Sequence, residues 1–112
     1  MTIAAPSSPE AWDEDIAREL VGCLVLVGIT YRFPDGSLGA QQQLFGYVRT
    51  ADPERGIELR LAGNYAGKTY RLPPDTRVFR SVPSGQYRLK ATGEVVSDPD
   101  YSCAWTINAP TQ

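Results

Sequence analysis

Residues 60–90 combine basic and aromatic side chains in a pattern that could bind single-stranded nucleic acid. The stretch holds seven lysines and arginines but one carboxylate, Asp75, and four aromatic rings lie among them. Such a mixture lets bases stack on rings while cations pair with phosphates. The alternative is the solvated outer face of a sheet, on which arginines alternate with buried neighbours. The formal net charge of the whole chain, −2, disfavours strong phosphate binding.

The chain offers little for catalysis or metal binding. It has no histidine, which removes the commonest general base and the commonest metal ligand. Asp98 and Asp100 bracket a proline and could serve acid–base chemistry, but aspartates in such tight turns usually bond the nearby backbone. Two cysteines are too few for a structural zinc site. We therefore predict no catalytic residue, no cofactor and no metal site, and hence no enzyme.

The cysteines and the N-terminus bear on location. Cys23 and Cys103 lie in apolar segments without a CxxC spacing, so we interpret them as reduced, buried small hydrophobes, with a redox pair as the alternative. The N-terminus lacks the basic and apolar regions of a signal peptide. The longest apolar run, residues 20–29, is shorter than the roughly 20 residues that span a bilayer. We expect a cytoplasmic protein that makes no membrane contact.

The stretch from Leu44 to Leu61 is predicted to form a β-hairpin around which the rest is organised. Apolar and charged residues alternate between Ile57 and Leu61, which is the period of a strand with one buried face. The run from Leu44 to Thr50 also reads as a strand, and a turn rich in Asp, Pro and Gly separates the two. Three glutamines, Gln41–Gln43, open the first strand and indicate that this end is exposed.

The 112 residues are predicted to form one domain, with residues 1–7 and 108–112 loose. An acidic helix is predicted over residues 8–21, with Ser8 as its N-cap. Trp12 would anchor this helix as a lid over one end of the sheet, or else serve as an exposed binding residue. From residue 23 onward, alternating apolar residues and regular turn signals predict short strands, among them a fifth strand over residues 77–82 and a small hairpin of residues 87–90 and 94–96.

The predicted strands are expected to close into a small barrel. Tight turns between neighbours favour an antiparallel sheet, and closure of a small twisted sheet removes its exposed edges. We therefore predict a mainly β fold, with an antiparallel barrel over residues 23–107, one N-terminal helix and an extra C-terminal β segment. The first strand, residues 23–32, is apolar on both faces, and we expect one face to meet the core and the other to meet the helix.

Two resemblances add to this prediction. The succession of helix, long strand, bent strand with Gly46, acidic turn and Gly-Ile-x-Leu-x-Leu from Gly56 resembles the Sm-like variant of SH3-like barrels over residues 10–82. It implies a fold, while the basic signature of Sm-like RNA binders is missing. A second resemblance, to a family of small uncharacterised bacterial proteins, covers nearly the whole domain and implies a bacterial cytoplasmic protein with no assigned activity. It rests on five short segments: residues 27–31, 72–75, 85–89, 91–96 and 98–101.

The predicted function is that of a binding module, most simply protein–protein interaction through an exposed face of the barrel. The alternative is single-stranded nucleic-acid binding through the basic and aromatic face of residues 60–90. Barrels of this type commonly bind along an exposed face or an edge strand. The partner is expected to be an unidentified protein, and the chain itself a monomer or a homodimer. The candidate binding face consists of Phe45, Tyr47, Arg60, Tyr65, Lys68, Arg71, Arg80, Tyr87 and Arg88.

Overall fold

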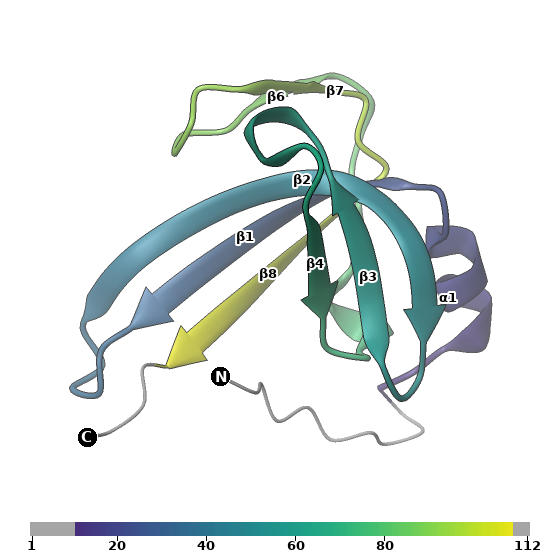
Figure 1. The fold of residues 1–112 in the computed structure, drawn as a ribbon, viewed down its shortest axis with the longest axis horizontal. Helices are drawn as coiled ribbons and strands as arrows, with labels where there is room; N and C mark the ends of the chain where they lie inside the picture. The colour runs from purple at the N-terminus through teal and green to yellow at the C-terminus, as the bar shows by residue number, and fades with distance from the viewer. Residues whose placement is uncertain (1–10, 109–112) are drawn as a thin grey trace.

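The computed structural model describes residues 11–108, which form a mainly β fold with one helix (Figure 1). The helix is α1 (Glu14–Leu20). Two 3₁₀ turns, η1 (Gly63–Tyr65) and η2 (Thr76–Val78), flank the fourth strand. The strands are β1 (Leu24–Arg32), β2 (Leu38–Asp52), β3 (Gly56–Leu61), β4 (Thr69–Leu72), β5 (Arg80–Ser81), β6 (Gln86–Arg88), β7 (Val95–Ser97) and β8 (Tyr101–Asn108).

Six strands form one mixed sheet in the order β4-β3-β2-β1-β8-β5, while β6 and β7 form a separate hairpin. The strands from β1 to β4 make an antiparallel meander, as predicted. However, β8 runs parallel to β1, so the prediction of an entirely antiparallel sheet was wrong. A parallel pair needs a crossover rather than a tight turn. The long path through β2–β5 and the β6–β7 hairpin supplies that crossover.

The edges of the sheet also differ from the prediction. The outermost strands β4 and β5 do not pair with each other within residues 11–108, so the predicted closure of the barrel is not seen. The fifth strand was predicted over residues 77–82 but contains only Arg80 and Ser81. The reason is a local cap: the Asp75 carboxylate accepts a hydrogen bond from the Arg77 N–H at 2.9 Å and starts η2 where a strand was expected.

The helix begins at Glu14, later than predicted. Its N-cap is Asp13, whose carboxylate accepts hydrogen bonds from two N–H groups of the first turn. The predicted cap, Ser8, lies outside the described residues. The segment just before the helix is held by Thr76 instead, which accepts from the Asp13 N–H at 2.9 Å and donates its own N–H to the Ala11 carbonyl at 2.8 Å. These bonds join the start of α1 to η2.

The main core lies on one face of the sheet, which we call the inner face. The alternation predicted for the third strand is confirmed, because Ile57, Leu59 and Leu61 are at most 6% exposed. α1 covers this core through the fully buried Leu20. Trp12 packs against the same core, as predicted for a lid, and its indole N–H donates to the Glu14 carboxylate at 2.8 Å.

The opposite face of β1, the outer face, packs against the β6–β7 hairpin. Leu24 of β1 is buried with Leu89 and Val96 of the hairpin region, and Leu26 and Phe45 pack against them. The expectation that this face would meet the helix was therefore wrong, because α1 lies on the inner side with the main core. Figure 1 shows the hairpin lying across β1 and β2, apart from α1.

Beyond β3 and β5 the sheet narrows to three strands. β3 pairs with β2 only from Gly46 to Asp52, and β5 pairs with β8 only at Tyr101 and Ser102. The remaining ends of β1, β2 and β8 continue side by side and extend away from β3 and β4 (Figure 1). We call this part, residues 28–32, 38–45 and 103–108, the three-stranded arm. Asn108, predicted to be loose, belongs to it.

A substitution at Gly46 tests how closely β2 packs against β3. A methyl group at Gly46 would collide with the carbonyl of Arg60, whereas one at Gly28 would meet nothing within 4 Å. We expect Gly46→Ala to lower the free energy of unfolding by about 1–3 kcal/mol, the usual cost of overpacking. Gly28→Ala is the matched control and should leave that free energy nearly unchanged. Urea denaturation measures both, and equal stability of the two variants would contradict the close approach.

Candidate functional site

A groove runs along β1 and β8, beside the β6–β7 hairpin at two of its hollows and beside β5 at the third. It consists of three adjoining hollows of about 430, 250 and 380 Å³. The first two share Gly28 and Gln43, and the last two share Ser102 and Cys103. We call the three hollows together the outer groove.

Small side chains make the floor of the outer groove. Along β1 and β8 every second residue faces outward, and the lining residues of this kind include Gly28, Ser102 and Ala104. The parallel register places Gly28 directly beside Ala104. The floor of the groove is therefore low because its outward side chains are small. The neighbouring part of β1 is covered by the β6–β7 hairpin, which rises beside this floor.

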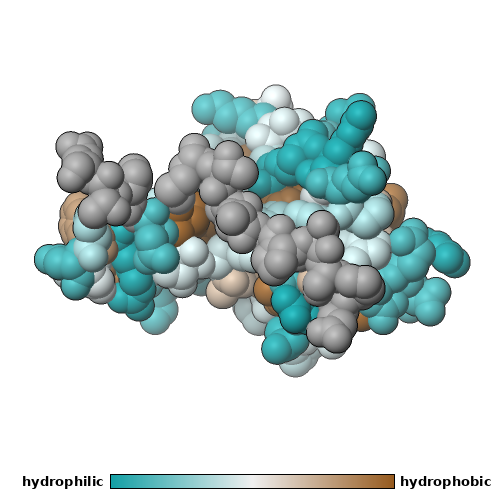
Figure 2. Space-filling view, turned by 90° about the horizontal axis from the view of Figure 1, so that it is seen from below, coloured by the Kyte–Doolittle hydropathy of each residue, from teal (hydrophilic) through white to brown (hydrophobic). Residues whose placement is uncertain are grey.

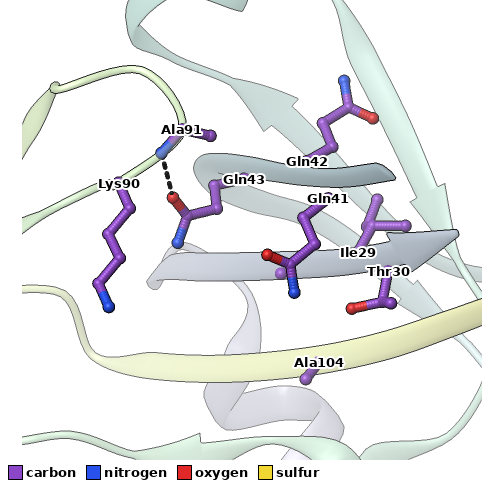
Figure 3. Close-up of a pocket in the computed structure, with 9 residues that line it drawn as sticks. Ile29, Thr30, Gln41, Gln42, Gln43, Lys90, Ala91 and Ala104 are labelled. Atoms are coloured by element: carbon purple, nitrogen blue, oxygen red, sulfur yellow. Dashed lines mark hydrogen bonds between the residues drawn. The ribbon is translucent and has the colours of Figure 1, made fainter. Parts of the chain in front are cut away.

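The largest of these three hollows has a volume of about 430 Å³. Figure 3 shows four polar side chains around it, on the same side of the sheet. They are the amides of Gln41 and Gln43, the hydroxyl of Thr30 and the ammonium of Lys90. Gln42 points to the opposite side, as the alternation of a strand requires. The hollow is thus lined by groups that donate and accept hydrogen bonds and by one cation.

The hairpin that forms the wall of the groove is fixed in place. At its tip, the Ala91 N–H donates to Gln43 Oε1 at 2.8 Å (Figure 3). The Glu94 carboxylate accepts from the Asn64 N–H at 2.9 Å, and Leu89 is buried against β1. These contacts hold the hairpin at a defined distance from the sheet, so the groove is preformed.

The outer groove carries positive charge without a carboxylate in its lining. Arg80, Arg88 and Lys90 line it, and none of its described lining residues is Asp or Glu. The Arg80 guanidinium donates to the Arg77 carbonyl at 2.8 Å. No ion pair among residues 11–108 involves Arg88 or Lys90. In a chain with a formal net charge of −2, such a cluster of cations attracts anions locally.

The thiol of Cys103, which packs in the main core on the inner face, is not activated for chemistry. Burial raises the pKa of Cys103 to about 12, so the thiol is protonated at neutral pH. Cys103 is only 7% exposed and unpaired, as predicted for a buried small hydrophobe, whereas Cys23 is half-buried. Within residues 11–108, no group of three or more His, Cys, Asp or Glu side chains could hold a metal ion. The lining offers hydrogen bonds and positive charge.

Three of the nine predicted binding residues, Arg80, Tyr87 and Arg88, line the outer groove. The Tyr87 hydroxyl donates to the Pro83 carbonyl at 2.6 Å, which fixes the ring. Phe45, which was expected to be exposed, instead lies partly buried in the cluster beneath the hairpin.

A second group of predicted residues lies on the outer side of β2, β3 and β4. Tyr47 is 49% exposed and pairs across the strands with Arg60. On β4, the Arg71 guanidinium lies 3.1 Å from the Glu58 carboxylate, which also meets Arg49 at 3.5 Å. We call these five residues the β2–β4 patch. Its one carboxylate offsets part of the charge of its three arginines.

The last two predicted residues lie apart from both surfaces. Tyr65 packs against the main core, and its hydroxyl accepts from Gln42 Nε2 at 3.3 Å. Lys68 is exposed in the turn before β4. The prediction therefore gathered residues from separate surfaces into one face.

Sequence reasoning missed much of the groove lining. The sequence identifies Lys90 as a basic residue and the glutamines as an exposed strand end. No local sequence pattern predicts that they lie close together. The link is the docking of the hairpin on Leu24 and Leu26 of β1, which is a contact between distant segments. The missed residues are Gly28, Thr30, Gln41, Gln43, Lys90, Ser102 and Ala104.

The raised pKa of Cys103 predicts slow thiol chemistry. In a Cys23→Ala variant, which leaves Cys103 as the single thiol, we expect labelling by a disulfide reagent at pH 8 to be at least tenfold slower in the native protein than in guanidinium chloride. Burial and the small thiolate fraction both slow the reaction. Native and denatured labelling at the same rate would contradict the burial.

The same pKa predicts a loss of stability at alkaline pH. The folded-state pKa of Cys103 lies above its ordinary value of 9.0. The protonated thiol therefore contributes fully to the free energy of unfolding below about pH 9, and this contribution is lost as the pH rises toward 12. We expect the free energy of unfolding to fall less over that interval in Cys103→Ala than in the parent protein. Urea denaturation at a series of pH values measures this, and parallel pH profiles would contradict the assignment.

No helix within residues 11–108 has the length and apolar character needed to cross a membrane. Comparison of the chain with protein-family models, with curated proteins and with solved structures finds no match. The similarities to Sm-like barrels and to a bacterial family therefore stay predictions, and function has to be argued from the surfaces described above.

Proposed function

We propose that this protein is a protein-binding module whose outer groove takes an extended acidic segment of its partner. The observation that carries the proposal is a groove lined by three cations and no carboxylate on a chain that is acidic overall. Carboxylates of the partner pair with Arg88 and Lys90, whose charges no described acid neutralises. Charge complementarity of this kind speeds encounter and selects the partner.

The shape and polarity of the outer groove support an extended segment as the ligand. Its hollows follow one another from Gln41, over the floor at Gly28, to Arg80. Gln41 and Gln43 carry amides that both donate and accept hydrogen bonds, as the backbone of a peptide does. A peptide lying along the groove meets neutral hydrogen-bonding groups at one end and cations along the hairpin side.

A second candidate is single-stranded nucleic-acid binding at the β2–β4 patch. The exposed ring of Tyr47 beside Arg60 is suited to stacking a base next to a paired phosphate. In the outer groove, by contrast, Tyr87 is the one aromatic side chain among the described lining residues, and it is half-buried. The cations without a neighbouring carboxylate thus lie in the outer groove, and the exposed ring lies in the β2–β4 patch. Because single-stranded nucleic acid needs cations and exposed rings on one surface, their separation favours a protein partner.

We also propose an SH3-like, Sm-like relationship for the fold and a cytoplasmic location. The relationship is supported by the helix followed by the β1–β4 meander and by the 3₁₀ turn η2 before β5. The insertion of β8 between β1 and β5 is a departure from that arrangement. The unpaired thiols of Cys23 and Cys103 support a reducing compartment.

The proposal is tested by selecting random linear peptides displayed on phage against the protein. We expect enrichment of peptides rich in Asp and Glu. A fluorescent copy of an enriched peptide should bind at least about tenfold more weakly to the double variant Arg88→Glu/Lys90→Glu, a loss of about 1.4 kcal/mol or more. Its binding to the parent protein should also weaken as salt is added, because the groove is open to solvent.

The matched control reverses two exposed cations outside the groove, Arg60→Glu/Lys68→Glu, with the same change in net charge. We expect the control to bind the acidic peptide as the parent protein does. Equal losses in both double variants, or a selection that yields no acidic peptides, would overturn the proposal. A labelled oligothymidylate that binds the parent protein and the groove variant, but not the control variant, would favour the second candidate.

A further inference from the structure

The edge of β2 in the three-stranded arm offers backbone groups that differ from the side chains of Gln41 and Gln43 lining the outer groove. β3 pairs with β2 only from Gly46 onward, and the bond from the Ala62 N–H to the Phe45 carbonyl, at 2.9 Å, continues that contact by one residue. Residues 38–44 pair with β1 on one side and with no described strand on the other. Figure 1 shows this part of β2 running along the border of the sheet.

The orientation of the backbone along this edge follows from the ladder pattern. In an antiparallel ladder, successive residues point their N–H and C=O groups alternately to the two neighbouring strands. The Phe45 carbonyl points to the β3 side, so Gln43 and Gln41 present their backbone groups to the same, open side. The irregular register opposite Arg32, near Gly39, ends the regular stretch.

The edge lacks the features that usually prevent strands from pairing. Natural edge strands carry charges, prolines or short lengths that discourage further pairing. Residues 38–45 contain no charged residue and no proline, and their one such feature is the irregularity near Gly39. Two exposed apolar side chains stand at the end of the same arm, Phe33 at 54% and Leu38 at 56%. The edge is therefore suited to a neutral strand with some apolar surface beside it.

We propose that two copies of this chain pair along this edge of β2, antiparallel about a two-fold axis at Gln41 or Gln42. A two-fold contact needs a surface that complements itself. A neutral strand places no like charges across the axis. The Gln41 amide can both donate and accept hydrogen bonds, so it can bond a glutamine of the second copy. The pairing joins the three-stranded arms of the two copies into one continuous sheet. This self-association is a different interaction from the proposed binding of an acidic partner in the outer groove.

Charge decides between this edge and the opposite edge of the arm. The free edge of β8 is also uncharged over residues 103–108, but Arg80 lines the hollow beside Cys103 and Ala104. A two-fold contact there would bring two copies of Arg80 toward each other, which is unfavourable. Arg80 pairs with Ser102 within the sheet itself. The β2 edge contains no charged residue, and Lys90, which lines the hollow next to Gln41–Gln43, belongs to the hairpin region and not to the sheet.

The first measurement is the molar mass by light scattering between about 10 μM and about 1 mM, the range in which a weak dimer assembles. We expect the mass to rise from that of one chain to that of two. Gln41→Lys and Gln41→Glu should each remain monomeric, because like charges meet at or next to the axis. An equimolar mixture of the two variants should restore the dimer, which a merely misfolded variant would not do.

The matched controls are Gln86→Lys and Gln86→Glu, which change an exposed glutamine in β6 and should dimerise like the parent protein. Hydrogen exchange supplies an independent readout, since the amides of Gln41 and Gln43 should exchange more slowly as the dimer forms. A protein that stays monomeric throughout the range would overturn the proposal. So would a dimer that is insensitive to both Gln41 variants or gives no protection at these two amides.

Discussion

The burial of β1 on both faces is the constraint on which the rest of the structure depends. Its inward residues join the main core, but Leu24 and Leu26 face outward and need a cover of their own. Fully burying one large apolar side chain stabilises a fold by about 1.5–3 kcal/mol. Leu24 is buried in this way and Leu26 partly, so their cover by the hairpin is favourable. Further along β1 the outward residues are Gly28 and Thr30, and the cover stops. The outer groove opens from Leu26 onward, where the outward side chains become small.

The same contact places the charges of the groove. Along the hairpin, Leu89 is buried against β1, whereas its neighbours Arg88 and Lys90 are exposed. The bond from the Ala91 N–H to Gln43 Oε1 fixes the tip of the hairpin, so the backbone that carries the two cations stays beside the floor of the groove. The positive charge of the groove is thus a consequence of apolar packing, and the glutamine that anchors the tip is also part of the lining.

What could be predicted from the sequence was local. The β2–β3 hairpin and the β6–β7 hairpin follow from alternation and turn residues, which act over a few positions. The start of α1 was missed because its segment is fixed by Thr76, a partner 63 positions from Asp13. The parallel pairing of β8 and the docking of the hairpin were missed for the same reason, since a two-residue period does not say which strand lies next to which. Basic and aromatic members of the groove were recognisable by type, whereas its small and amide-bearing floor was not.

The distribution of charge would keep the two proposed surfaces selective for different partners. Charged residues make up 21% of the chain, yet residues 36–48, which include the β2 edge, contain none. An acidic strand added at that edge would find no cation to pair with, while in the groove it would meet Arg88 and Lys90. A neutral strand would prefer the β2 edge, which supplies free backbone groups. In the groove, a neutral strand would leave Arg88 and Lys90 without partners. Specificity is a difference between two affinities, and here the absence of charge on one surface contributes to it as much as the presence of charge on the other.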